Sequence, residues 1–203
     1  MSEWKLIYES FEPGQEGLRE ALCTLGNGYF ATRGAAPWAR ADDVHYPGTY
    51  IAGGYNRLRT EVAGRVVENE DLVNFPNWLA LGFRIGAGEW FDLRAVKLLE
   101  YRQELDLRRG MLRRSLRFED GEGRRSRLEE RRFVSMADMH LAVEDIHLND
   151  EPAGTLVGEA VAKRVRDEFV QRECEREPVD RDIADPSKNA GDPVPQLVEH
   201  ASS

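Results

Sequence analysis

Apolar and polar residues alternate in short runs along most of this chain, and turn-forming residues separate the runs. Such runs occupy residues 4–8, 29–32, 79–85 and 90–93, and a further pair at residues 111–118 and 124–133 flanks a glycine-containing loop. Residues 62–67 centre on Gly64 as a hairpin would, and residues 140–148 alternate again. A period of two predicts half-buried strands, and short, evenly spaced strands predict an antiparallel sandwich. Residues 96–105 fit either a short helix or irregular structure.

The pattern changes after residue 148. Apolar residues now recur every three or four positions, at Leu156, Val157, Val161, Val165, Phe169 and Val170. This spacing predicts an amphipathic helix lying on an available apolar surface. Residues 175–203 combine four prolines with Asp, Glu, Ser and Asn, which predicts a disordered tail. The chain is therefore expected to be mainly β, with a sandwich at residues 1–148, a helical segment at 149–174 and a tail at 175–203.

Glycine is concentrated in the segment LGNGYFATRG at residues 25–34. Three glycines in ten residues disfavour a helix interior. We expect Gly26 and Gly28 to occupy turns with positive φ, followed by a short strand at residues 29–32 and a break at Gly34.

This segment is the first of five blocks with a recognisable order. The others are PGTYIAGGYN at 47–56, NFPNW at 74–78, LDLRRG at 105–110 and RFVSMADMHL at 132–141. Together they resemble the N-terminal domain of glycoside hydrolase family 65, whose members are phosphorylases and hydrolases of maltose, kojibiose, trehalose and related α-glucosides. The resemblance covers residues 4–148 and is not evident beyond them.

The resemblance implies a galactose-mutarotase-like super-sandwich, here incomplete. In the family the catalytic Glu lies in a later helical barrel, and inorganic phosphate is the co-substrate of the phosphorylases. No residue of this chain matches those sites, so we expect no catalytic residue, no metal and no cofactor. An α-linked glucose disaccharide would be bound through a barrel outside this chain, and the family's dimerisation implies a homo-oligomer. A truncated or shifted reading frame would explain such a chain.

Net charge and cysteine content indicate which classes of partner and which cellular compartment are expected for this protein. The net charge of −9 disfavours nucleic acid and anionic membranes as partners, because their phosphates would be repelled. The two cysteines, Cys23 and Cys174, fit reduced thiols better than a disulfide framework. No secretory signal and no apolar run of membrane-spanning length is present, which predicts a cytoplasmic protein.

Four residues are candidates for one edge of a sugar site: Tyr50, Asn74, Asn77 and Trp78. An aromatic ring can stack on the C–H face of a pyranose, and neighbouring amides can bind its hydroxyls. The alternative is structural, with the amides stabilising turns and Trp78 facing the core.

The sequence thus favours a non-catalytic N-terminal domain of a disaccharide phosphorylase or hydrolase. A stand-alone carbohydrate-binding or protein-interaction module remains the alternative, and a non-functional fragment is a third reading.

Overall fold

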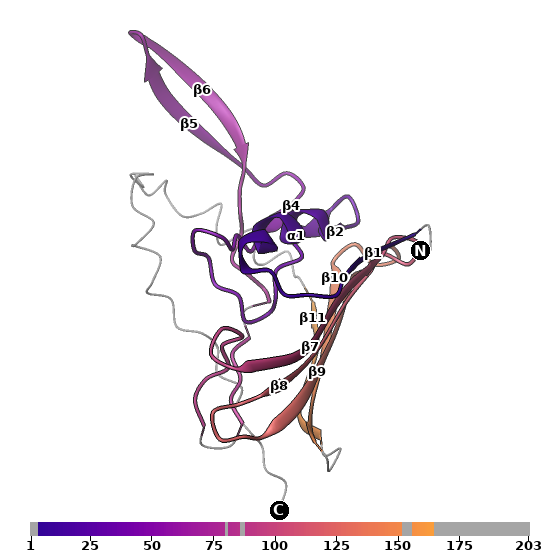
Figure 1. Ribbon diagram of the computed structural model, residues 1–203. Helices are drawn as coiled ribbons and strands as arrows, with labels where there is room; N and C mark the ends of the chain where they lie inside the picture. The colour runs from indigo at the N-terminus through magenta and orange to yellow at the C-terminus, as the bar shows by residue number, and fades with distance from the viewer. Residues whose placement is uncertain (1–3, 80, 86–87, 152–155, 165–203) are drawn as a thin grey trace, which may run out of the picture.

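The protein is known from a computed structural model that describes residues 4–79, 81–85, 88–151 and 156–164. Antiparallel strands dominate this part of the chain, with one short α-helix (Figure 1). The elements are β1 (Lys5–Tyr8), a 3₁₀ turn (Pro13–Gln15), α1 (Glu16–Leu22), β2 (Leu25–Gly26), β3 (Phe30–Thr32), β4 (Thr49–Ile51), β5 (Tyr55–Val62), β6 (Arg65–Leu72), β7 (Lys97–Asp106), β8 (Met111–Glu119), β9 (Arg125–Val134), β10 (Leu141–Glu151) and β11 (Leu156–Arg164).

A six-stranded antiparallel sheet forms the larger layer, with strand order β1-β7-β8-β9-β10-β11. Burial alternates strictly along β9, where every second residue from Ser126 to Val134 is buried. Strand β8 follows the same rule, with Leu112, Leu116 and Phe118 facing inward. The predicted strands at 111–118, 124–133 and 140–148 are confirmed, because a period of two places one face of each strand against the interior.

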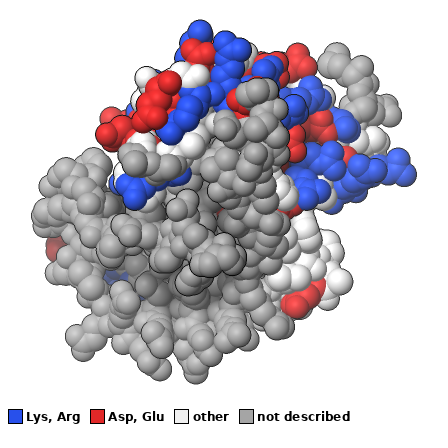
Figure 2. Space-filling model, turned by 90° about the horizontal axis from the view of Figure 1, so that it is seen from below, with Lys and Arg blue, Asp and Glu red and all other residues white. Residues whose placement is uncertain are grey.

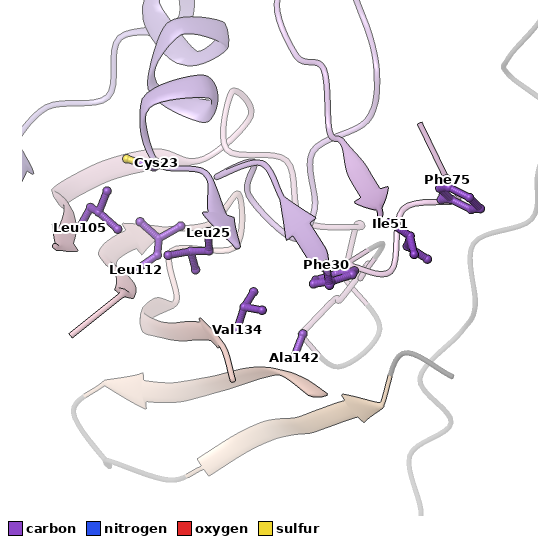
Figure 3. Close-up of a cluster of buried hydrophobic side chains, with 9 residues drawn as sticks. All are labelled: Cys23, Leu25, Phe30, Ile51, Phe75, Leu105, Leu112, Val134 and Ala142. Carbon is purple, nitrogen blue, oxygen red and sulfur yellow. The ribbon is translucent and has the colours of Figure 1, made fainter. Parts of the chain in front are cut away.

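The smaller layer is the three-stranded sheet β2-β3-β4, which packs on one end of the large sheet. Side chains from both sheets and from the end of α1 meet in one buried cluster (Figure 3). Its members are Cys23, Leu25, Phe30, Ile51, Phe75, Leu105, Leu112, Val134 and Ala142. Two layers closed around a shared core confirm the predicted mainly β, sandwich-type fold.

Strands β5 and β6 form a separate two-stranded ribbon that projects from the body of the molecule (Figure 1). All sixteen residues of its two strands are exposed. The ribbon turns at Ala63 and Gly64, which both have positive φ, so the predicted hairpin around Gly64 is confirmed. Ion pairs from Arg57 and Arg59 to Glu68 and Glu70 lie on one of its faces.

The glycine-rich segment agrees with prediction at one of its two turns. Gly28 has a φ of 87° and precedes β3, as expected. The prediction of positive φ for Gly26 was wrong, because Gly26 ends β2 and pairs with Ala31. The segment therefore forms a tight β-hairpin rather than a loop followed by a lone strand.

Two predictions in the middle of the chain were also wrong. Residues 97–106 form neither a helix nor irregular structure but the ten-residue strand β7, whose alternation is interrupted by a bulge between Leu98 and Glu100. Conversely, the described residues between 79 and 93 form no extended strand, only an isolated bridge between Arg84 and Trp90. Their apolar side chains pack against the large sheet through aromatic contacts instead of through a backbone ladder.

The predicted amphipathic helix is corrected over its first part. Residues 156–164 form β11, which pairs antiparallel with β10. Backbone pairing explains the difference, because β10 offers a free edge whose N–H and C=O groups need partners and a helix cannot supply them. Gly158 and the β-branched Val157 and Val161 also favour a strand over a helix. The rest of that predicted helix, and the predicted tail at 175–203, lie outside the described residues.

Helix α1 was not predicted, although its glutamates and leucines are good helix formers. Within the described residues, no helix is long and apolar enough to span a membrane.

Candidate functional site

Asn74 and Tyr50 lie at the same strand, β4. The Asn74 Oδ1 accepts a hydrogen bond from the Thr49 N–H at 2.9 Å, and its Nδ2 donates to the Pro47 carbonyl at 3.2 Å. The next residue, Phe75, donates its N–H to the Thr49 carbonyl at 2.8 Å. Asn74 therefore holds the 74–75 segment along the start of β4.

Tyr50 is half-buried in the middle of β4. Burial raises the pKa of its phenol, nearby Tyr46 adds to this, and Arg33 opposes it. The Tyr50 hydroxyl lies close to Gly48. A Cβ added at position 48 would be 2.7 Å from the Tyr50 oxygen. A larger residue at position 48 would therefore require the Tyr50 and Arg33 side chains to shift.

Trp78 packs against the core, and Asn77 makes a local turn contact. The Trp78 indole N–H donates to Thr32 Oγ1 at 3.1 Å, and its ring meets Phe30 edge-on with centroids 5.8 Å apart. Asn77 Oδ1 accepts the Leu79 N–H at 3.1 Å in a local turn. The structure brings Tyr50 and Asn74 together at β4, whereas Asn77 and Trp78 make their own separate contacts. All four have structural partners, and their contact with a sugar stays a prediction.

A cavity elsewhere in the fold is a candidate ligand site. A cavity of about 320 Å³ opens between the loop at residues 36–45, the turn at 92–94 and the large sheet. Helix α1 contributes Glu16 to its lining, and the large sheet contributes Tyr101 and Arg114. Its volume lies at the lower end of the range typical of small-molecule pockets.

Aromatic rings shape the cavity's apolar side. Trp38 meets Phe91 edge-on at 5.2 Å and Phe83 at 6.4 Å, and Phe83 stacks on Phe91 at 4.5 Å. On the other side Phe11 packs against Tyr101 with centroids 5.7 Å apart. These contacts fix the rings in place, so Trp38 and Phe11 present preformed apolar surfaces to the cavity.

Asp42 organises the loop at the cavity's rim. Its Oδ1 accepts N–H groups from His45 and Val44 at 2.7 and 2.9 Å, and its Oδ2 pairs with Arg94 at 2.9 Å. The hydrogen bond from the His45 backbone, followed by those from Val44 and Arg94, lowers the pKa of Asp42 to about 2 although partial burial opposes this. The rim carboxylate is therefore ionised under all ordinary conditions.

His45 and Glu16 also line the cavity. Both are ionisable, and His45 is half-buried while Glu16 is buried. His45 Nδ1 lies 2.7 Å from Glu20 Oε1, and this hydrogen bond raises the pKa of His45 against the opposing effect of burial. Burial raises the pKa of Glu16, while Arg114, Arg19 and His45 counteract the rise. Glu16 is 4% exposed and accepts a hydrogen bond from Arg19 at 3.2 Å.

A buried ion network supports the cavity from the sheet side. Arg114 pairs with Glu130, and Arg132 pairs with Glu130 and, at 3.1 Å, with Glu144. Both arginines also reach the segment after β3: Arg114 Nη2 donates to the Gly34 carbonyl at 3.1 Å, and Arg132 Nη2 donates to that of Ala35 at 2.9 Å. The network thereby attaches the start of the 36–45 loop to β8 and β9.

Sequence reasoning missed this cavity. The loop's own composition, with Trp38, Arg40, Asp42 and His45 close together, was the available signal. The rest of the lining comes from residues 92–94, Tyr101 and Arg114, which are distant in sequence, and from Phe11 and Glu16, of which Glu16 lies in α1, a helix that was not predicted. Among the described residues, no group of three or more His, Cys, Asp or Glu could hold a metal ion.

The chain is similar to a known protein family. A family model described as glycosyl hydrolase family 65, N-terminal domain, matches residues 6–177. The match continues beyond residue 148, where the resemblance was expected to end, and so includes β11.

Individual relatives agree with the family model. An uncharacterized glycosyl hydrolase of Mycobacterium tuberculosis is 50% identical over 73% of this chain and 11% of its own length. A kojibiose phosphorylase of Caldanaerobacter subterraneus is 34% identical over 68% of this chain and 17% of its own. A solved structure described as a kojibiose phosphorylase from the human microbiome shares the fold, with a TM-score of 0.66, 24% identity, and coverage of 73% of this chain and 20% of its own. The chain thus spans a fifth or less of the length of these proteins.

Proposed function

The chain belongs to glycosyl hydrolase family 65, and from that premise we propose that it is the non-catalytic N-terminal domain of an enzyme that cleaves an α-linked glucose disaccharide. The observation that carries the proposal is the match of the family's N-terminal model to residues 6–177. The name of the Caldanaerobacter relative, a kojibiose phosphorylase, supports a disaccharide as the substrate of the whole enzyme.

The buried carboxylates support a non-catalytic role. Glycoside cleavage needs a carboxylic acid that can give its proton to the leaving oxygen and a base or nucleophile on the opposite face. Glu130 and Glu144 are held by arginines inside the sheet network, and Glu16 by Arg19 on α1. These groups stabilise the fold, and catalysis would belong to a barrel domain. Inorganic phosphate, a homo-oligomeric state and a cytoplasmic location remain predictions for that enzyme.

An activity assay tests the proposal. The purified protein is incubated with maltose, trehalose and kojibiose, each with and without inorganic phosphate. We expect no release of glucose or glucose phosphate above the protein-free blank. Turnover that follows the protein through purification would contradict the non-catalytic assignment.

A further inference from the structure

We infer that the cavity between residues 36–45, residues 92–94 and the large sheet is a binding site for a neutral saccharide. This site is distinct from the predicted sugar-edge residues at β4 and at residues 74–78. It requires no catalytic activity and applies to the described part of the chain by itself.

The cavity's size and walls suit one or two sugar rings. The cavity of about 320 Å³ is partly open to solvent and is lined by the Trp38 and Phe11 rings, which pack against other aromatic rings. A pyranose has faces rich in C–H groups, and an aromatic ring contacts them without a loss of hydrogen bonds. A preformed aromatic wall lowers the conformational entropy lost on binding.

The rim carries the groups that bind paired hydroxyls. Asp42 is an ionised acceptor, and Arg94 is a planar donor whose side chain is 60% exposed. The pair uses one Asp42–Arg94 hydrogen bond at 2.9 Å, so other guanidinium N–H groups of Arg94 still face solvent. Asp92 and Arg40 add a second carboxylate and a second guanidinium to the lining of the same cavity. A carboxylate accepts from one hydroxyl of a vicinal pair while a guanidinium donates to the other.

Arg114 lies at the sheet side of the cavity. Its side chain lines the cavity and is 2% exposed, and its guanidinium lies 5.8 Å from the centre of the Trp38 ring. Both terminal nitrogens are bonded within the protein, but Nε has no hydrogen-bond partner among the described residues. This Nε is inaccessible, so Arg114 contributes to the cavity through its place beside the Trp38 ring and not as a donor to the ligand.

Charge balance selects a neutral ligand. Three carboxylates, Glu16, Asp42 and Asp92, line the cavity together with the three guanidiniums of Arg40, Arg94 and Arg114. His45, the other ionisable cation of the lining, is paired with Glu20. An anion such as a sugar phosphate would find as many repulsive groups as attractive ones, whereas hydroxyls can bind to both kinds.

Saturation-transfer NMR and calorimetric titration with maltose, trehalose and glucose test the inference, with glucose 6-phosphate as the charged comparison. We expect transfer to the neutral sugars and a Kd in about the millimolar range, as for other small polar ligands. Arg94→Gln and Asp42→Asn should each weaken binding by roughly tenfold, the effect of losing one charge-assisted hydrogen bond. Both residues lie at the exposed rim, so the variants should fold.

Arg125→Gln is the matched control. Arg125 is 59% exposed and pairs with Glu119 at 3.0 Å, almost as Arg94 pairs with Asp42, but it lies on the outer face of β9. This variant should bind sugar as the unchanged protein does. The inference is overturned if no neutral sugar binds, if Arg125→Gln weakens binding as much as Arg94→Gln, or if only glucose 6-phosphate binds.

Discussion

Arg132 is completely buried, and its guanidinium contacts the carboxylates of Glu130 and Glu144. The same side chain reaches the backbone carbonyls of Arg33 and Ala35. One residue of β9 thereby connects two carboxylates of the large sheet with the segment that leads into the cavity loop. Removing one member of such a network leaves the remaining buried charges with less compensation.

Arg132→Met is expected to lower the free energy of unfolding by about 3–5 kcal/mol, because Glu130 keeps only Arg114 as its counter-ion and Glu144 loses its ion pair with Arg132 while both carboxylates stay buried. Urea denaturation followed by circular dichroism measures the change. Arg125→Met on the same strand removes an exposed ion pair and should cost less than about 1 kcal/mol. Equal losses in the two variants would show that the buried network contributes little to stability.

Strands β8 and β9 could be predicted from the sequence because two β-prone runs flank a glycine-containing loop, and β10 because apolar residues recur at every second position on either side of a phase change after Glu144. Strand β7 could not, since the bulge after Leu98 shifts the phase and Glu104 is buried beside Lys5 and Arg102. Strand β11 could not either, because its spacing over nine residues fits a helix as well as a strand. The free edge of β10 decides that these residues form a strand, and no local sequence pattern encodes that edge.

The roles of the candidate site residues could likewise be predicted only in part from the sequence. Asn74, Asn77 and Trp78 were recognised as polar and aromatic residues beside a proline, but their hydrogen-bond partners determine what they do. Those partners, among them Thr32 and Thr49, are set by the packing of β3 and β4. The cavity depends still more on distant segments, so sequence patterns could indicate its loop and not its walls.

Strand β11 has a testable role as the cover of an edge. A chain ending at residue 151 would expose the whole outer edge of β10, an eleven-residue strand, to pairing with other chains. We expect this variant to form oligomers or aggregates on size-exclusion chromatography. A chain ending at residue 164, which keeps β11, serves as the control and should have the same oligomeric state as the full protein. Identical elution of the two shortened chains would contradict the role assigned to β11.

On the scale of the whole molecule, the outer face of the large sheet is charged but balanced. Arg117 pairs with Glu100 and Glu151, and Arg131 pairs with Asp145. Figure 2 shows blue and red side chains interleaved over the described part of the face in view. About ten arginines between residues 108 and 132 therefore do not create a basic surface, and two of them, Arg114 and Arg132, point inward. This balance of charge does not favour nucleic acid as a partner.

We propose that this chain is equivalent to the N-terminal domain of its relatives and that it has no catalytic role. The most direct test replaces the aligned N-terminal region of the Caldanaerobacter kojibiose phosphorylase, 34% identical, with the corresponding residues of this chain. Phosphate-dependent release of glucose phosphate from kojibiose is then measured. The matched control is the same enzyme with that region deleted.

We predict that the chimera folds and phosphorolyses kojibiose with kcat within about tenfold of the parent enzyme, or about 1.4 kcal/mol in activation free energy, since no transition-state contact is exchanged. The deletion control should be inactive or insoluble. A folded chimera with the parent's oligomeric state but no turnover would contradict the account, because it would mean that the exchanged region supplies groups essential to the chemistry.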